Sequence, residues 1–168
     1  MIYQTVQQMK KQLLQLNQWF DAAVAHADAK KFDPNLYLGF RLAPDQFGLV
    51  KQVQVACDTS KLMAARLTGK EAPKHADDEK TLEELRARVA DVATYLGTFT
   101  EQDFAGAAER VITQPRWEGK VMSGADYFLE HAVPNFFFHL AHAYAILRHN
   151  GVPLGKRDYL GALTQRLP

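Results

Sequence analysis

Apolar residues recur along the first thirty positions at alternating spacings of three and four, a pattern typical of one face of a helix. Glutamine and lysine occupy much of the opposite face. The pattern predicts a first helix that ends before KFDPNLYLGFRLAPD, where Pro34, Gly39 and Pro44 interrupt helical structure and a short helical turn is expected near residues 34–39. The apolar face consists of Val6, Met9, Leu13, Leu16, Phe20, Ala23 and Ala27.

A second helix is predicted from Pro44 to Leu67. Proline suits the first turn because its φ is fixed, Asp45 is stabilised at the positive helix end, and Gly69 marks the stop. The segment GKEAPKHADDEK that follows is polar and contains a proline, so we expect a surface loop. The predicted core stripe of this helix is Phe47, Val50, Val53, Cys57, Ala64 and Leu67.

A third helix is indicated by Leu82, Leu85, Val89, Val92 and Leu96, which repeat the spacing of three and four. Thr81 and Glu84 form a candidate capping pair at its start. The pattern then changes in RVITQPRWEGKVMS, where two short apolar runs flank turn-forming residues. This segment predicts a short β-hairpin or an extended crossover.

The last helix is predicted to begin at Ser123, a cap assisted by Asp126, and to end at the stop pair Asn150 and Gly151. No repeat, low-complexity tract or change of composition marks a domain boundary. The pattern therefore predicts one all-α domain over residues 1–168, a four-helix bundle with a long connection before the last helix that can contain a β-hairpin. Up-down-down-up and simple up-and-down orders of the helices both fit the pattern.

Composition narrows the function without identifying it. Hydrophobic residues make up 47% and charged residues 23% of the chain, and the formal net charge is +1. The basic pairs are scattered, so neither nucleic acid nor an anionic membrane surface is an expected partner. The single cysteine, Cys57, is expected to be buried filler, and the first residues lack a secretory pattern, so we expect a cytoplasmic protein.

The last helix carries a polar stripe in the sequence NFFFHLAHAYAILRHN. His131, Asn135, His139, His142 and His149 fall within an arc of about 80° on an ideal helix. This stripe either faces water or lines a bundle cavity, and its lack of lysine and glutamate favours the cavity. The apolar run from Ala132 to Leu147 falls short of the ~20 residues that a membrane span requires.

Two polar residues of the second helix, Gln54 and Asp58, lie one turn apart and can face the same interior. Two interpretations stay open. The side chains can line a ligand pocket, in which His139 and His142 bind a metal together with Asp58, or they can satisfy one another in an internal hydrogen-bond network. The candidate ligand-binding set is Gln54, Asp58, Asn135, His139 and His142.

Four segments, FDPNLYLGFRLAPDQF, QVQVACDTSK, PNFFFHLAHAYAILRHNGV and GKRDYLG, resemble a domain-of-unknown-function branch of the DinB-like four-helix bundles over nearly the whole chain. The superfamily implies a metal site with one histidine on the second helix and a His-x-x-x-His pair on the fourth, used by thiol-dependent transferases, isomerases and hydrolase candidates. Aligned on LRHNG, these positions hold Gln54, Asn135 and His139. Amides are poor ligands for a transition metal because they are neutral and weakly basic.

The resemblance therefore implies a degenerate metal site and a module that binds a small ligand or interacts with a partner, without a confident cofactor. The alternative is a divalent-metal enzyme of thiol-transferase or hydrolase type that holds zinc or nickel through His139, His142 and Asp58. The aromatic residues Phe136, Phe137, Phe138 and Tyr144 cannot all face one core, which predicts a homodimer.

Overall fold

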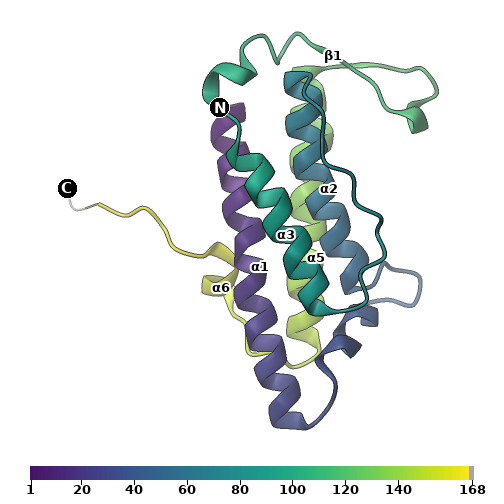
Figure 1. The fold of residues 1–168 in the computed structure, drawn as a ribbon, viewed down its shortest axis with the longest axis vertical. Coiled ribbons are helices and arrows are strands. Elements are labelled where there is room, and N and C mark those ends of the chain that lie inside the picture. The colour runs from purple at the N-terminus through teal and green to yellow at the C-terminus, as the bar shows by residue number, and fades with distance from the viewer. Residues whose placement is uncertain (167–168) are drawn as a thin grey trace.

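Four long helices form the bundle in the computed structural model, which describes residues 1–166 (Figure 1). Their order is up-down-down-up, so α2 and α3 run parallel and the linker between them returns along the bundle (Figure 1). Of the two helix orders that fit the sequence pattern, the structure therefore has the up-down-down-up order. The bounds are α1 Ile2–Lys30, α2 Leu49–Thr68, α3 Leu82–Gly97 and α5 Val133–His149.

The core consists of one apolar stripe from each long helix. All seven residues of the face predicted for α1 are fully buried, and the five of α3 are at most 3% exposed, so both patterns are confirmed. Cys57 is fully buried as expected, and burial raises the pKa of its thiol to about 12. A short helix, α6 (Lys156–Leu160), covers α1, where the backbone oxygen of Asp158 accepts a hydrogen bond from Trp19 Nε1 at 3.0 Å.

The predicted start of α2 is wrong. The helix begins at Leu49 rather than Pro44, and Phe47 is 53% exposed instead of lying in the core. The reason is that the chain first turns back on itself: Leu49 N donates to Phe40 O at 3.0 Å. A Cβ on the N-cap residue Gly48 would lie 3.0 Å from the backbone oxygen of Leu38, so glycine suits this close approach.

Local capping signals are confirmed elsewhere. Thr81 and Glu84 form a capping box at the start of α3, and Gly69 ends α2 with a φ of 75°. The expected helical turn is the 3₁₀ helix η1 (Pro34–Gly39). At the end of α5 only Gly151 of the predicted stop pair is left-handed, with a φ of 92°, since Asn150 has a φ of −90°.

The connection between α3 and α5 contains a β-hairpin, one of the two alternatives that the sequence left open. After the 3₁₀ turn η2 (Glu101–Phe104), β1 (Val111–Ile112) pairs antiparallel with β2 (Met122–Ser123), with Val111 opposite Ser123. The 3₁₀ turn η3 (Pro115–Trp117) forms its tip. Ser123 Oγ then accepts a hydrogen bond from the backbone N of Asp126 at 3.1 Å, which confirms the predicted cap.

Helix α5 is preceded by a wider helical turn. The α-helical turn α4 (Gly124–Asp126) leads into a π-helical turn, η4 (Tyr127–Ala132), which continues into α5 without a break. Such π-helical turns are rare and occur frequently at functional sites. In residues 1–166, none of the helices combines the length and the apolar character that crossing a membrane requires.

The linker between α2 and α3 is fastened by one buried guanidinium. The Arg88 side chain on α3 is 1% exposed and bonds Asp58 of α2 at 2.7 Å. It also bonds Asp77 at 2.7 Å and Glu79 at 2.8 Å, both on the linker. A buried charge is tolerated only when it is paired and hydrogen-bonded, so this cluster, the Arg88 network, dictates where the linker lies.

We expect Arg88→Met to lower the free energy of unfolding by about 3 kcal/mol or more, because it leaves three carboxylates without their shared cation. Arg86→Met on the same helix is the control. Its carboxylate partners Asp21 and Glu83 are 72% and 88% exposed, so a loss of about 1 kcal/mol or less is expected. Urea denaturation followed by circular dichroism measures both, and equal losses would contradict this role for Arg88.

Candidate functional site

The polar edge of α2 lies between two hollows. Asp58, Leu62 and Arg66 follow one another at single-turn spacing and line both of them. One hollow, the linker-side groove, has a volume of about 760 Å³ and is bounded by α2 and residues 69–75. The other, the hairpin-side cavity, has a volume of about 290 Å³ and is lined by Val55, Asp58, Thr59, Leu62, Arg66, Gln114, Pro115, Arg116, Tyr127, His131 and Asn135.

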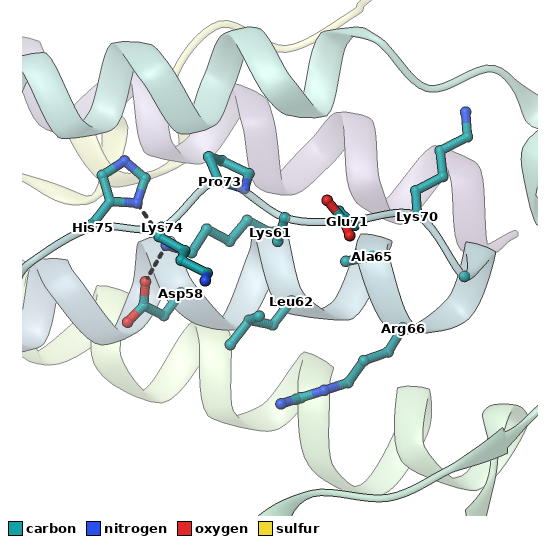
Figure 2. A pocket seen from close by; sticks show the side chains of 12 residues that line it. Asp58, Lys61, Leu62, Ala65, Arg66, Lys70, Glu71, Pro73, Lys74 and His75 are labelled. Atoms are coloured by element: carbon teal, nitrogen blue, oxygen red, sulfur yellow. Dashed lines mark hydrogen bonds and ion pairs between the residues drawn. The ribbon is translucent and has the colours of Figure 1, made fainter.

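The polar side chains at the inner end of the linker-side groove are fully engaged (Figure 2). Lys61 Nζ lies 2.8 Å from Asp58 Oδ1 and donates to His75 Nδ1 at 2.6 Å. An ammonium can only donate, so His75 Nδ1 accepts and His75 Nε2 carries the proton that it shares with Asp91 Oδ2 at 2.8 Å. This series of hydrogen bonds connects the linker to α2 and α3, so its role is structural.

The hairpin-side cavity draws its lining from four parts of the fold. Arg66 comes from α2, whereas Gln114 and Arg116 come from the hairpin and Asn135 from α5. The π-helical turn η4 supplies Tyr127 and His131, whose rings stack with centroids 5.5 Å apart. Trp117 at the hairpin tip packs edge-on against both rings, which confines this end of the cavity.

The protonation of His131 follows from its neighbour. Arg116 Nη2 lies 2.6 Å from His131 Nε2, and because a guanidinium can only donate, Nε2 accepts and Nδ1 carries the proton. Burial lowers the pKa of His131, and the charges of Arg116 and Arg66 lower it further, so the ring is neutral at neutral pH. In the described chain, this buried Nδ1–H has no hydrogen-bond partner.

Gln114 is a second buried group with an unused donor. Gln114 is only 7% exposed, and its side-chain Nε2 has no hydrogen-bond partner within residues 1–166. The arginines nearby are also without carboxylate partners in that part of the chain, since Arg66 donates to the hydroxyl of Tyr127 at 3.0 Å and Arg116 to His131. Among the described residues, the cavity thus combines two arginines without a carboxylate partner and buried donors without an acceptor.

The sequence-predicted ligand set is divided between the two sides of α2. Gln54 Nε2 donates to Glu79 at 2.7 Å, and Asp58 accepts from Arg88 and Lys61, so the bonds of both are made on the linker side. Of the five predicted residues, Asp58 and Asn135 line the hairpin-side cavity, whereas Gln54, His139 and His142 do not.

The predicted residues of α5 bond α2 at other positions. Asn135 Nδ2 donates to Thr59 Oγ1 at 2.7 Å. His139 Nδ1 donates to Gln52 Oε1 at 2.7 Å, so the residue of α2 that faces His139 is Gln52 and not Gln54. These two bonds fix the register of the antiparallel pair α2 and α5.

The polar stripe of α5 changes its surroundings along the helix. His139 is 7% exposed and borders a neighbouring hollow with Phe138 and Asn135, whereas His149 is exposed. His142 lies between these extremes, and its Nδ1 donates to Phe138 O of its own helix at 2.7 Å. The polar stripe therefore faces α2 at His139 and water at His149.

The ligand positions implied by the DinB resemblance do not fit a metal centre here. Within residues 1–166, no three or more His, Cys, Asp or Glu side chains are grouped so that they could hold a metal ion. Asp58, His139 and His142 therefore do not form such a group, because Asp58 belongs to the Arg88 network while His139 bonds Gln52. The amides of Gln54 and Asn135 direct N–H donors to other residues, which is the opposite of what a cation needs.

Sequence reasoning missed the residues that distinguish the hairpin-side cavity. Arg66, Gln114 and Arg116 belong to none of the apolar or polar stripes predicted from the sequence, and two of them lie in the hairpin, whose position depends on the tertiary fold. A usable signal existed in Gln114, Arg116 and Trp117, a polar and aromatic group that surrounds a proline within the predicted hairpin.

Comparison with known proteins gives a consistent family assignment. Residues 1–160 match the model of a domain of unknown function, DUF1993. The structure is similar to the crystal structure of a DinB family member protein from Shewanella denitrificans, with 55% sequence identity and a TM-score of 0.94 over 97% of this chain and 93% of that one. No protein of curated function matches.

His139 makes stability depend on pH in a definite direction. Burial lowers the pKa of His139 to about 4, and the charge of His142 adds to this effect, whereas the ordinary value is 6.5. Between these values the unfolded chain binds more protons, so stability is complete above about pH 6.5 and is lost as the pH falls toward about 4. We expect this term to reach about 3 kcal/mol.

The measurement is the free energy of unfolding by urea between pH 7 and pH 4.5 for three proteins. His139→Gln should flatten the dependence, whereas His149→Gln, which changes an exposed histidine of the same helix, should leave it as in the wild type. Parallel curves for the wild type and His139→Gln would contradict the assignment of this pH dependence to His139.

Proposed function

The chain belongs to the DUF1993 family of DinB-like proteins, and on that premise we propose that it is a small-molecule-binding module whose site is the hairpin-side cavity. The cavity lies between α2, the hairpin and η4, and Asn135, one of the positions aligned with the metal ligands of the wider superfamily, is part of its lining. Its volume of about 290 Å³ is at the small end of ligand cavities, which are typically about 300–1,000 Å³.

The observation that carries this proposal is the buried side-chain N–H of Gln114, which residues 1–166 leave without an acceptor. An unpartnered buried amide costs about 1–3 kcal/mol, so a protein retains one where something else supplies the acceptor. The terminal torsion of a glutamine is soft, so a small rotation can turn its N–H toward a ligand in the cavity. His131 Nδ1–H, which belongs to another lining residue, is unpartnered in the same way among the described residues.

Other polar groups of the bundle show the contrast. Gln52 uses both ends of its amide, because Oε1 accepts from His139 and Nε2 donates to Phe47 O at 3.2 Å. Asn135 and Thr59 bond each other. The interior polar groups between α2 and α5 thus have a purely structural explanation, whereas those of the hairpin-side cavity do not.

The alternative function is a divalent-metal enzyme of thiol-transferase or hydrolase type. It draws support from the superfamily alone, because Asp58, His139 and His142 bond other residues and amides stand at the other ligand positions. The predicted homodimer also stays a prediction, for which Leu129 and Phe138, 57% and 53% exposed, are the candidate contact residues.

We expect Gln114→Met to leave the ligand-free protein as stable as the wild type or slightly more so, because it removes an unsatisfied polar group at similar volume. Gln52→Met is the matched control and should cost about 1–3 kcal/mol, since it leaves His139 Nδ1–H without its acceptor. Thermal unfolding of both variants, alone and with a library of small polar compounds, is the measurement. Compounds that bind the cavity should raise the melting temperature of the wild type and not of Gln114→Met.

Two results would count against the proposal. A loss of stability in Gln114→Met as large as that in Gln52→Met would make Gln114 a structural residue. Compounds that stabilise the wild type and Gln114→Met equally would place their binding site elsewhere.

The proposal also predicts that protein purified without a histidine tag carries far less than one zinc or nickel ion per chain. The reason is that the described residues offer no three-ligand group of His, Cys, Asp and Glu side chains. Elemental mass spectrometry measures the content. One tightly held ion per chain, lost in His139→Ala, would favour the metal-enzyme alternative instead.

A further inference from the structure

The hairpin-side cavity offers hydrogen-bond donors in excess of acceptors. Arg66 and Arg116 contribute guanidinium groups, which only donate, and the buried N–H groups of Gln114 and His131 are unused by the described residues. The side-chain amide N–H of Asn135 is already given to Thr59. A ligand that complements this lining must therefore be rich in acceptors.

The uncompensated charges that line the cavity are positive. Asp58 is the one carboxylate in the lining, and its Oδ1 accepts from both Arg88 and Lys61, so its negative charge is compensated from the linker side. Arg66 and Arg116 have no such compensation within residues 1–166, and both lower the pKa of the neighbouring His131. The local field therefore favours an anion.

The remaining lining is apolar and limits the shape of the anion. Val55, Leu62 and Pro115 join the ring of Tyr127 around the polar groups. A bare inorganic ion would leave these surfaces in contact with water, whereas a small organic body would bury them at a gain of roughly 25 cal/mol per Å². Planar guanidinium groups match a carboxylate with two parallel hydrogen bonds.

We infer that the ligand of the hairpin-side cavity is an organic carboxylate with a small apolar body, whose carboxylate is held by Arg66 and Arg116 and whose oxygens also accept from Gln114. The inference rests on the proposed function and adds the chemical class of the ligand. It uses no metal, and the neutral His131 donates its Nδ1–H to the same group.

The test uses three probes, namely benzoate, its neutral analogue benzamide and inorganic phosphate. Each is titrated into ¹⁵N-labelled protein at neutral pH, and the side-chain amide signal of Gln114, identified by its loss in Gln114→Met, reports binding. We expect benzoate to shift and saturate this signal and to bind at least about tenfold more tightly than benzamide and phosphate, because only benzoate has both a carboxylate and an apolar body.

Variants separate contact with the ligand from general charge. Arg66→Gln should weaken benzoate at least about tenfold, and Arg66→Lys should lie between Arg66→Gln and the wild type, because it keeps the charge but loses the planar fork. Lys74→Gln removes one positive charge from the linker-side groove without touching the cavity, so affinity should stay within about twofold. A melting curve for each variant verifies that the bundle is intact.

The outcomes distinguish this inference from the proposed function. Equal binding of benzamide and benzoate, abolished in Gln114→Met, would overturn the carboxylate and leave the binding module. Tighter binding of phosphate would overturn it in favour of an inorganic oxyanion. The inference would also be overturned if Lys74→Gln weakened benzoate as much as Arg66→Gln does, or if no probe changed the Gln114 signal. In either case the proposed function would be tested separately, by thermal unfolding of the wild type and Gln114→Met with the compound library.

Discussion

The buried guanidinium of Arg88 is the constraint on which the rest of the arrangement depends. Because α2 and α3 are parallel, the linker between them must cross the length of the bundle, and such a polar segment has little apolar surface of its own to bury. Arg88 holds it by collecting Asp77 and Glu79 from the linker together with Asp58 from α2. The cost of burying this cation is offset only while all its partners stay in place. The same pairing compensates Asp58, so the opposite side of α2 keeps the positive field of Arg66 and Arg116.

The polar groups between α2 and α5 form a structural contact and not a group of converging ligands. A metal needs lone pairs from several side chains that converge on one point. Here Asn135 donates to Thr59 and His139 donates to Gln52, so each polar group is paired with a single neighbour across the helix interface. The neutral state of His139 serves this pairing, because a buried imidazolium without a carboxylate partner would be costly.

What the sequence could predict depended on whether the cause was local. The apolar face of α1, the Thr81 cap and the β1–β2 hairpin follow from spacing and turn chemistry within one segment, and all are confirmed. The start of α2 was missed because it depends on a bond to Phe40 after the chain turns back. In the candidate site, two residues along a helix amount to a rotation of about 200°, so Gln52, which bonds His139, and Gln54, which bonds Glu79, lie on different faces of α2. Periodicity alone does not show which of these two faces meets α5.

A helical bundle satisfies its own backbone, so recognition of a ligand must come from side chains or from segments that leave the helix. In this chain the departures from regular helix, the hairpin tip η3 with its N-cap and the π-helical turn η4, supply Gln114, Arg116, Tyr127 and His131 to the polar lining of the hairpin-side cavity. They also bring aromatic rings against each other, which gives the polar groups a fixed apolar support. Buried donors are tolerated at such a place because the core of the bundle, which includes the fully buried Trp19 and Phe136, supplies the stability that the cavity gives up. The loss of stability that a binding site causes is therefore confined to the segments that depart from the regular bundle. The polar groups of the α2–α5 interface can then stabilise the fold.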